Sequence, residues 1–154
     1  MLAAIAAGCG SSPATVIRSP TTTPQAPAAT TPATATGGQA QQITVNPATG
    51  LKSGQRVRVQ ASGFSPGEAL VITQCASKGT ATGPGDCNLN AMQGVTADDS
   101  GRVRADFTVT KGPFGANNIV CGPAQACLIS VTQATPSLTQ EADALITFGL
   151  PDPE

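Results

Sequence analysis

The sequence contains no histidine, tryptophan or tyrosine, and only four of its 154 residues are phenylalanine. Histidine is the commonest general base and metal ligand near neutral pH. Its absence excludes Ser-His and Cys-His nucleophilic catalysis, together with zinc sites that mix cysteine and histidine. Charged residues make up 11% of the chain, against about a quarter in an average protein. We therefore expect no enzymatic activity, no cofactor and no metal site.

The charge balance argues against electrostatic binding to polyanions. Eight basic and nine acidic residues give a net charge of −1, so direct contact with nucleic acid is not expected. Four arginines could still share one exposed sheet face and meet anionic head groups or an envelope polymer: Arg56, Arg58, Arg102 and Arg104. We favour the alternative, a solvated face that Asp106 and Glu68 balance.

Residues 10–42 have the composition of a disordered tether. They consist mainly of Thr, Pro, Ala, Ser, Gly and Gln, with Arg18 as the one charge, and Val16 and Ile17 as the large apolar residues. Such a segment cannot bury enough apolar surface to offset the entropy lost on ordering, and its prolines prevent a helix. We expect residues 9–42 to form a linker.

The first nine residues, Met-Leu-Ala-Ala-Ile-Ala-Ala-Gly-Cys9, resemble the lipobox of bacterial lipoproteins, in which the cysteine is acylated and becomes the mature N-terminus. Ala6 stands where lipoboxes usually have Leu, and no basic residue precedes the apolar run. Residues 1–8 are thus interpreted as part of a signal sequence. The alternative is an apolar tip with a free thiol. No run approaches the ~20 apolar residues of a membrane span, so the expected membrane anchor is a lipid on Cys9.

From residue 43 to 150 the apolar residues recur with a period of two, interrupted by turn signals. This pattern predicts seven strands, over residues 43–46, 56–63, 69–75, 92–96, 102–110, 126–132 and 142–148. No segment has helical periodicity. Seven short strands in a domain of this length predict an all-β, immunoglobulin-like sandwich, followed by a tail at 151–154.

Four cysteines remain once Cys9 is assigned to the lipid anchor. Local pairing as Cys75–Cys87 and Cys121–Cys127 would close two short loops, each contributing about 2–3 kcal/mol through the unfolded state. A zinc site built from all four is the competing interpretation, but neither gap is the CxxC that zinc prefers. Disulfides are favoured, and they place the domain outside the cytoplasm.

Several segments of the domain carry a resemblance to known proteins: Gly50-Leu-Lys-Ser-Gly-Gln-Arg-Val-Arg-Val, Ala61-Ser-Gly-Phe-Ser-Pro-Gly67, Ile72-Thr-Gln-Cys75, Cys87-Asn, Val95-Thr-Ala-Asp-Asp-Ser-Gly101 and Ala144-Leu-Ile-Thr-Phe148. Together, and in this order, they resemble the neocarzinostatin family of actinobacterial enediyne apoproteins. The resemblance implies a seven-stranded sandwich with two local disulfides. It also implies a cleft beside one sheet that holds an apolar enediyne chromophore and delivers it to DNA, which the chromophore cleaves.

Carried over residue by residue, the family's cleft positions fall on two strands and the loops beside them: Thr73, Cys75, Ser77, Cys87, Met92, Leu128, Ser130 and Thr132. Phe114 stands where the family has an aromatic lid. The strand pattern agrees, because inward-facing Leu70 and Ile72 leave Val71, Thr73 and Cys75 on the outer face. The alternative is a loop that covers this face.

Three cleft positions depart from the family. Ser77 and Met92 stand where the family has aromatic residues, and Leu128 replaces a glutamine. Such a cleft is apolar and adaptable but has no rings on which an enediyne could stack. The sequence therefore predicts a monomeric, non-catalytic, lipid-anchored protein of the cell envelope that binds a small apolar molecule. The alternatives are an envelope interaction module with a vestigial cleft, or an antimicrobial enediyne-type apoprotein.

Overall fold

The computed structural model describes residues 40–135 and 141–149. All described residues belong to one compact unit, Gly37–Glu154. The predicted signal sequence, Cys9, the tether up to residue 39 and the tail at 151–154 therefore lie outside the described residues.

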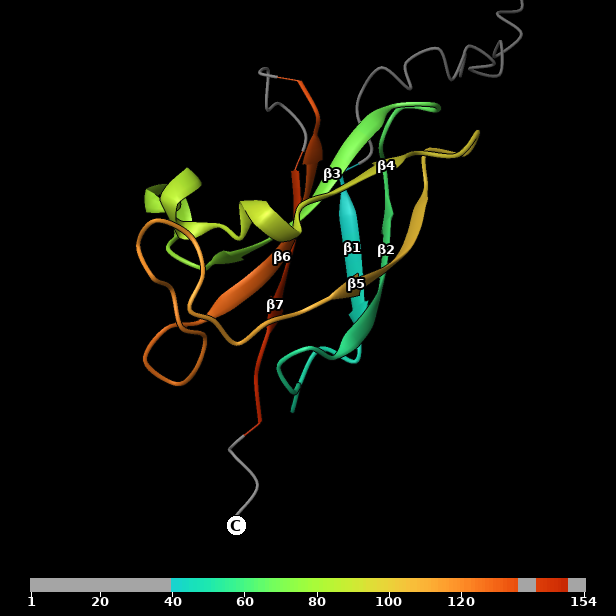
Figure 1. Ribbon diagram of the computed structural model, residues 1–154. Helices are drawn as coiled ribbons and strands as arrows, with labels where there is room; N and C mark the ends of the chain where they lie inside the picture. The colour runs from blue at the N-terminus through green and yellow to red at the C-terminus, as the bar shows by residue number, and fades with distance from the viewer. Residues whose placement is uncertain (1–39, 136–140, 150–154) are drawn as a thin grey trace, which may run out of the picture. The chain divides into compact units, whose positions relative to one another are not determined.

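Seven strands form, one at each position that the sequence predicts (Figure 1). They are β1 (Gln42–Asn46), β2 (Arg56–Ser62), β3 (Ala69–Ala76), β4 (Gln93–Thr96), β5 (Val103–Thr108), β6 (Cys127–Gln133) and β7 (Glu141–Ile146). The connection from β3 to β4 carries three single turns of 3₁₀ helix, namely η2 (Gly79–Ala81), η3 (Pro84–Asp86) and η4 (Leu89–Ala91). Within the described residues, no helix is long and apolar enough to cross a membrane.

The strands form two antiparallel sheets. One has the order β1-β2-β5, and the other has the order β4-β3-β6-β7. This arrangement confirms the predicted seven-stranded sandwich. In the four-stranded sheet β3 and β6 are the central strands, so both faces of this sheet are defined mainly by their side chains.

The core lies between the sheets, and every aromatic side chain of the protein lies in it or packs against it. Alternate residues of the strands point inward, including Val57 and Val59 of β2 and Ile129 and Val131 of β6, which are at most 1% exposed. Three phenylalanines belong to the core cluster and the fourth packs against it: Phe64, Phe107, Phe114 and Phe148.

The turn between β4 and β5 depends on Asp98 and Gly101. The Asp98 carboxylate accepts hydrogen bonds from the backbone N–H groups of Ser100 and Arg102 at 2.8 and 3.0 Å. These two bonds, that from Arg102 first, lower the pKa of Asp98. Gly101 has φ +69°, and a Cβ there would lie 2.0 Å from the carbonyl oxygen of Phe64. Glycine is therefore required at this position.

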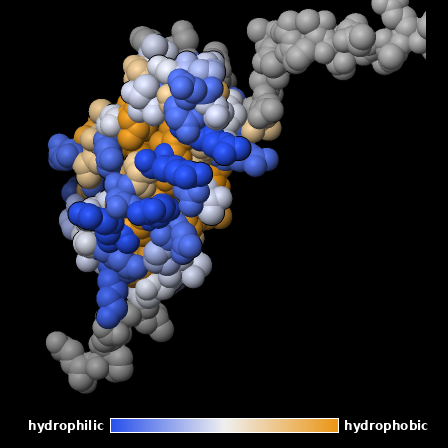
Figure 2. Space-filling view, turned by 90° about the vertical axis from the view of Figure 1, so that its right-hand side faces the viewer, coloured by the Kyte–Doolittle hydropathy of each residue, from blue (hydrophilic) through white to orange (hydrophobic). Residues whose placement is uncertain are grey.

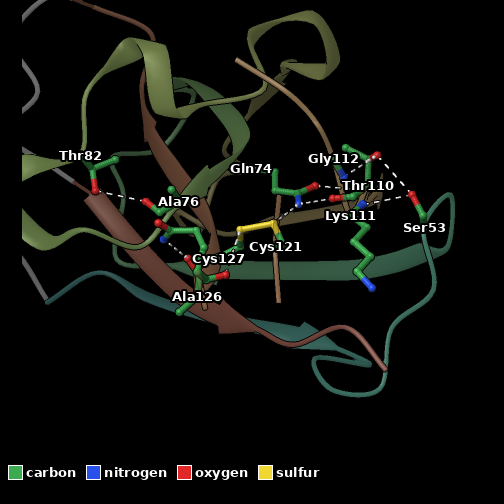
Figure 3. The surroundings of a disulfide bond; sticks show 11 residues. Ser53, Gln74, Ala76, Thr82, Thr110, Lys111, Gly112, Cys121, Ala126 and Cys127 are labelled. Carbon is green, nitrogen blue, oxygen red and sulfur yellow. Dashed lines mark hydrogen bonds between the residues drawn. A yellow bond between two sulfur atoms is a disulfide. The ribbon is translucent and has the colours of Figure 1, made fainter. Parts of the chain in front are cut away.

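A buried amide connects the two sheets at Gln74, which is 0% exposed (Figure 3). Its Nε2 donates to the carbonyl of Thr110 at 2.6 Å, and its Oε1 accepts from the backbone N–H of Thr110 at 2.9 Å. Nε2 also lies 3.4 Å from Sγ of Cys121. Gln74 belongs to β3, whereas Thr110 follows β5 of the opposite sheet. The side-chain amide of Gln74 therefore exchanges two hydrogen bonds with the backbone of Thr110, as two paired strands would, and links the sheets across the core.

We predict that Gln74→Leu lowers the free energy of unfolding by about 2–4 kcal/mol, because it leaves the partly buried N–H and carbonyl groups of Thr110 without these partners. Urea unfolding followed by circular dichroism measures the loss. Gln60→Leu, on the exposed side of β2, is the matched control and should change stability by less than about 0.5 kcal/mol. Equal losses for both variants would show that the Gln74 bridge has no special role.

Candidate functional site

A groove of about 570 Å³ lies along the outer face of the four-stranded sheet. Its floor is made by outward-facing side chains of β3 and β6. One wall comes from the η2–η4 segment, and the other comes from the end of β6 and from β7. The lining residues are Val71, Thr73, Cys75, Thr82, Gly83, Pro84, Cys87, Leu89, Met92, Leu128, Ser130, Thr132, Gln133, Ala134, Thr135, Glu141 and Asp143.

The register of β3 against β6 places the floor residues side by side. Thr73 pairs with Ser130, Cys75 with Leu128, and Val71 with Thr132. Because side chains alternate along a strand, their neighbours Ile72 and Ile129 point into the core. The predicted division of both strands into an inner and an outer face is therefore confirmed.

The first wall is attached to the floor through the disulfide between Cys75 and Cys87. The following residue, Asn88, donates its backbone N–H to the carbonyl of Gln74 at 2.8 Å. These bonds hold η4 beside the sheet, where Leu89 and Met92 line the groove while each remains 52% exposed. Two large apolar side chains are thus held in water at the groove margin.

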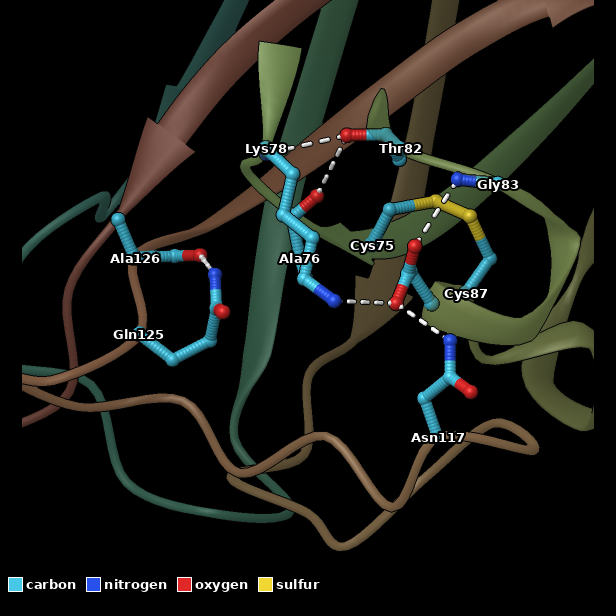
Figure 4. Close-up of polar contacts among 10 residues, drawn as sticks. Cys75, Ala76, Lys78, Thr82, Gly83, Cys87, Asn117, Gln125 and Ala126 are labelled. Atoms are coloured by element: carbon cyan, nitrogen blue, oxygen red, sulfur yellow. Dashed lines mark hydrogen bonds and ion pairs between the residues drawn. A yellow bond between two sulfur atoms is a disulfide. The ribbon is translucent and has the colours of Figure 1, made fainter. Parts of the chain in front are cut away.

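An ion pair between the buried carboxylate of Asp86 and the partly exposed ammonium of Lys78 fixes the loop that carries this wall (Figure 4). Asp86 is 4% exposed, and its carboxylate accepts hydrogen bonds from Lys78 Nζ at 2.6 Å, Asn117 Nδ2 at 2.8 Å and the Gly83 N–H at 3.0 Å. The Lys78 bond contributes most, followed by those of Asn117 and Gly83, and together they lower the pKa of Asp86 from 3.8 to about 2.

The loop from residue 113 to 119 packs directly against η3. The backbone N–H of Asn117 donates to the carbonyl of Gly85 at 3.0 Å. Gly115 has φ +67°, and a Cβ there would lie 2.3 Å from the same carbonyl oxygen. The approach of the two loops therefore depends on glycine at position 115.

The second disulfide joins Cys121 and Cys127, beside Gln74 (Figure 3). Both predicted pairings are confirmed, and the interpretation of the four cysteines as zinc ligands is wrong because each sulfur is bonded to another sulfur. Nowhere in residues 40–135 and 141–149 do three His, Cys, Asp or Glu side chains gather as a metal site.

Seven of the nine predicted site residues line the groove, and Ser77 and Phe114 do not. Ser77 follows β3, where its backbone N–H donates to the carbonyl of Ala126 at 2.8 Å. Phe114 is 7% exposed and belongs to the core, and its backbone exchanges two hydrogen bonds with that of Ile119. The expectation that Phe114 forms a lid is corrected: the sandwich has few large residues and uses this ring as core.

Ten lining residues were not among the predicted site residues, and the most informative of them are Leu89, Glu141 and Asp143. Glu141 and Asp143 are opposite Thr132 and Ser130 in the pairing of β6 with β7, so they share the outer face of the sheet. The Ser130 hydroxyl donates to Glu141 Oε1 at 3.0 Å. The alternation of inward and outward residues within β7, with Ala142 inward, is the sequence signal that places Glu141 and Asp143 on the outer face.

The predicted arginines lie on the opposite side of the sandwich, on and next to the three-stranded sheet. Figure 2 shows hydrophilic side chains over the side of the molecule that includes β2 and β5. Arg58 Nε lies 3.1 Å from Asp106 Oδ1, so Asp106 balances the face as expected. Glu68 does not balance the charge of the arginine face, because its carboxylate accepts hydrogen bonds from the Ser65 N–H and from Gln133 Nε2 instead.

The Asp86 network predicts a specific dependence of stability on pH. Because folding lowers the pKa of Asp86, the carboxylate stabilises the fold above about pH 4, and this contribution disappears as the pH falls toward 2. The difference in unfolding free energy between the wild type and Asp86→Asn should therefore be largest at pH 5–6 and shrink by pH 2. Lys78→Met should reduce the same pH-dependent part. A difference unchanged between pH 6 and 2 in urea titrations contradicts the assignment.

Comparison with known proteins places the sandwich in a family. Residues 43–148 match the model of the neocarzinostatin family. The chain is 35% identical over 112 residues to macromomycin of Streptomyces macromomyceticus, covering 69% of this chain and 75% of that protein. It is 39% identical over 77 residues to the antitumor antibiotic C-1027 apoprotein of Streptomyces globisporus, covering 50% of this chain and 52% of that protein.

Solved structures agree with the sequence comparison. The macromomycin structure superposes with a TM-score of 0.57 at 30% identity, over 71% of this chain and 99% of macromomycin. The solution structure of apokedarcidin gives a TM-score of 0.51 at 26% identity, over 72% of this chain and the whole of that chain. A family match that covers the entire sandwich, with the two disulfides in place, leads to one conclusion: the chain belongs to the neocarzinostatin family.

Proposed function

We propose that this protein is a non-catalytic carrier that binds a small apolar molecule in the groove of the four-stranded sheet. The observation that carries the proposal is the composition of the groove. Leu128 and the Cys75–Cys87 disulfide form an uncharged floor, and Leu89 and Met92 stand beside it half-exposed to water. Soluble proteins rarely expose clustered apolar side chains, so a cluster of them in a concave site indicates that a ligand binds there.

The groove is suited in size and chemistry to a molecule of a few rings. Its volume of about 570 Å³ lies within the range of roughly 300–1,000 Å³ that is usual for small-molecule sites. Met92 is flexible and polarisable, so it can adapt to ligands of irregular shape. Each Å² of apolar surface that a ligand removes from water contributes about 25 cal/mol.

The surroundings of the groove's hydroxyl groups support a carrier that binds its ligand without catalysing a reaction. Ser130, hydrogen-bonded to Glu141, is the lining residue that most resembles an activated nucleophile. It lies on β6, which pairs with β3 on one side and β7 on the other, so its neighbouring backbone N–H groups are engaged in the sheet. No oxyanion hole is available from them, and the chain has no histidine to act as a base.

The relatives favour a second candidate, an antibiotic apoprotein, since the C-1027 relative carries that description in its name. The groove argues against a ligand gripped by aromatic stacking. All four phenylalanines of the chain lie in or against the core, and none lines the groove. We therefore propose an apolar ligand that is held by aliphatic and sulfur contacts.

We further propose that the carrier is a lipid-anchored, extracytoplasmic protein of the cell envelope. The sequence Ala7-Gly8-Cys9 supports acylation of Cys9, and the Thr/Pro/Ala-rich segment after it would allow the sandwich to stand away from the membrane. Two disulfides are in keeping with an oxidising compartment.

Native mass spectrometry of the protein purified from its own host tests ligand binding. We expect a reproducible extra mass in the wild type, at least tenfold reduced in Leu128→Asp or Met92→Asp, because a carboxylate in the groove removes its apolar character. Val120→Asp is the matched control, since Val120 is 50% exposed outside the groove. A bare mass in the wild type would reject the carrier and favour an envelope interaction module.

The anchor has a separate test. Cys9→Ser removes the acylation site, so we expect this variant to move from the membrane fraction to the culture medium. Radiolabelled palmitate should be incorporated into the wild type and not into the variant. Membrane association that persists in Cys9→Ser would show that another feature of the protein holds it there.

A further inference from the structure

The groove has a second, polar region that the carrier proposal does not use. At the level of the lining residues Thr73, Ser130 and Asp143, three neighbouring strands pair in register, so a polar row crosses β3, β6 and β7. Glu141 lies two residues before Asp143 on the same face of β7. Alternate residues of a strand are about 6.6 Å apart, so a single small group can contact both carboxylates.

The charge in this region has one sign. Glu141 and Asp143 are the charged members of the described groove lining, which contains no lysine or arginine. The sequence between β6 and β7, Ala-Thr-Pro-Ser-Leu-Thr-Gln over residues 134–140, contains no basic residue either. Lys78 is paired with Asp86 at 2.6 Å. The two carboxylates therefore face an otherwise uncharged groove.

The hydroxyl group of Thr73, in the floor of the groove, is a second and independent indication that a polar group of a ligand binds here. Thr73 is 8% exposed and lines the groove, yet no group in the described part of the chain forms a hydrogen bond with its side chain. A buried polar atom without a partner is rare in native proteins and calls for a ligand or water. Its neighbour Ser130 donates its own proton to Glu141, so this carboxylate is already oriented.

We infer that the ligand is an amphipathic amine, whose protonated nitrogen lies at Glu141 and Asp143 while its apolar body covers Leu128 and the Cys75–Cys87 disulfide. An ammonium has three donors and no acceptor. The two carboxylates accept, and the Thr73 hydroxyl oxygen can accept the third proton. This inference rests on the proposed carrier function and defines the class of molecule carried.

Three matched probes test the inference by fluorescence titration of the full-length protein. Dansylcadaverine carries a terminal ammonium, N-acetyldansylcadaverine is neutral, and dansyl-6-aminohexanoate carries a carboxylate on a chain of similar length. At low ionic strength we expect the cation to bind about fivefold or more tightly than the neutral probe, and the anion to bind most weakly. The preference should diminish as salt screens the carboxylates.

Conservative variants separate charge from shape. Glu141→Gln and Asp143→Asn should each reduce the ratio of the affinity for the cation to that for the neutral probe, and the double variant should abolish this preference. Asp99→Asn, in the exposed β4–β5 turn outside the groove, is the control with the same loss of charge. Thermal melts establish that each variant is folded.

The outcomes distinguish the two proposals. Equal affinity of the wild type for the cationic and neutral probes, with both lost in Leu128→Asp, would overturn the amine and leave the carrier intact. Binding of neither probe in the groove would reject both proposals. A preference for the cation that survives in the Glu141→Gln/Asp143→Asn double variant would overturn the assignment of the ammonium to β7.

Discussion

The pairing of β3 with β6 is the constraint on which the rest of the structure depends. Over seven paired positions it places one set of side chains in the core and the alternate set in the groove. A shift of one residue would exchange the two faces, turning Thr73 and Ser130 toward the core and Ile72 and Ile129 toward the groove. The two disulfides and the Gln74 bridge all begin at residues of these strands. The same pairing therefore determines the core, the groove and the attachment of its wall.

The character of the groove follows from how the sandwich uses its few large side chains. Of the four phenylalanines, three lie in the core, including Phe114 in the loop before Cys121, and Phe148 packs against it. What remains for the groove is aliphatic, sulfur-containing or small and polar, with two carboxylates along one side. The residues that line the groove indicate which molecules fit it. An aliphatic floor and an acidic side suit a flexible apolar amine better than a large flat ring system.

The fold could be predicted from the sequence because its signals are local. Strict alternation in residues such as Val57, Val59 and Ala61 located the strands, and the short cysteine spacings indicated local pairing. The faces of β3 and β6 followed from the same alternation. Other features depend on contacts between residues distant in the sequence. Gln74 is polar within an apolar face, and its partner Thr110 is 36 residues away. The inward position of Phe114 likewise follows from tertiary packing, which no local pattern encodes.

The central claim is that the groove on the four-stranded sheet is a binding site, and methyl NMR tests it most directly. In a titration with N-acetyldansylcadaverine, the account predicts that the methyl resonances of Leu128 and Met92 shift together and saturate, while that of Val120, exposed elsewhere on the surface, stays unchanged. Shifts of Val120 as large as those of Leu128 and Met92, or no shift in any of the three, would contradict it.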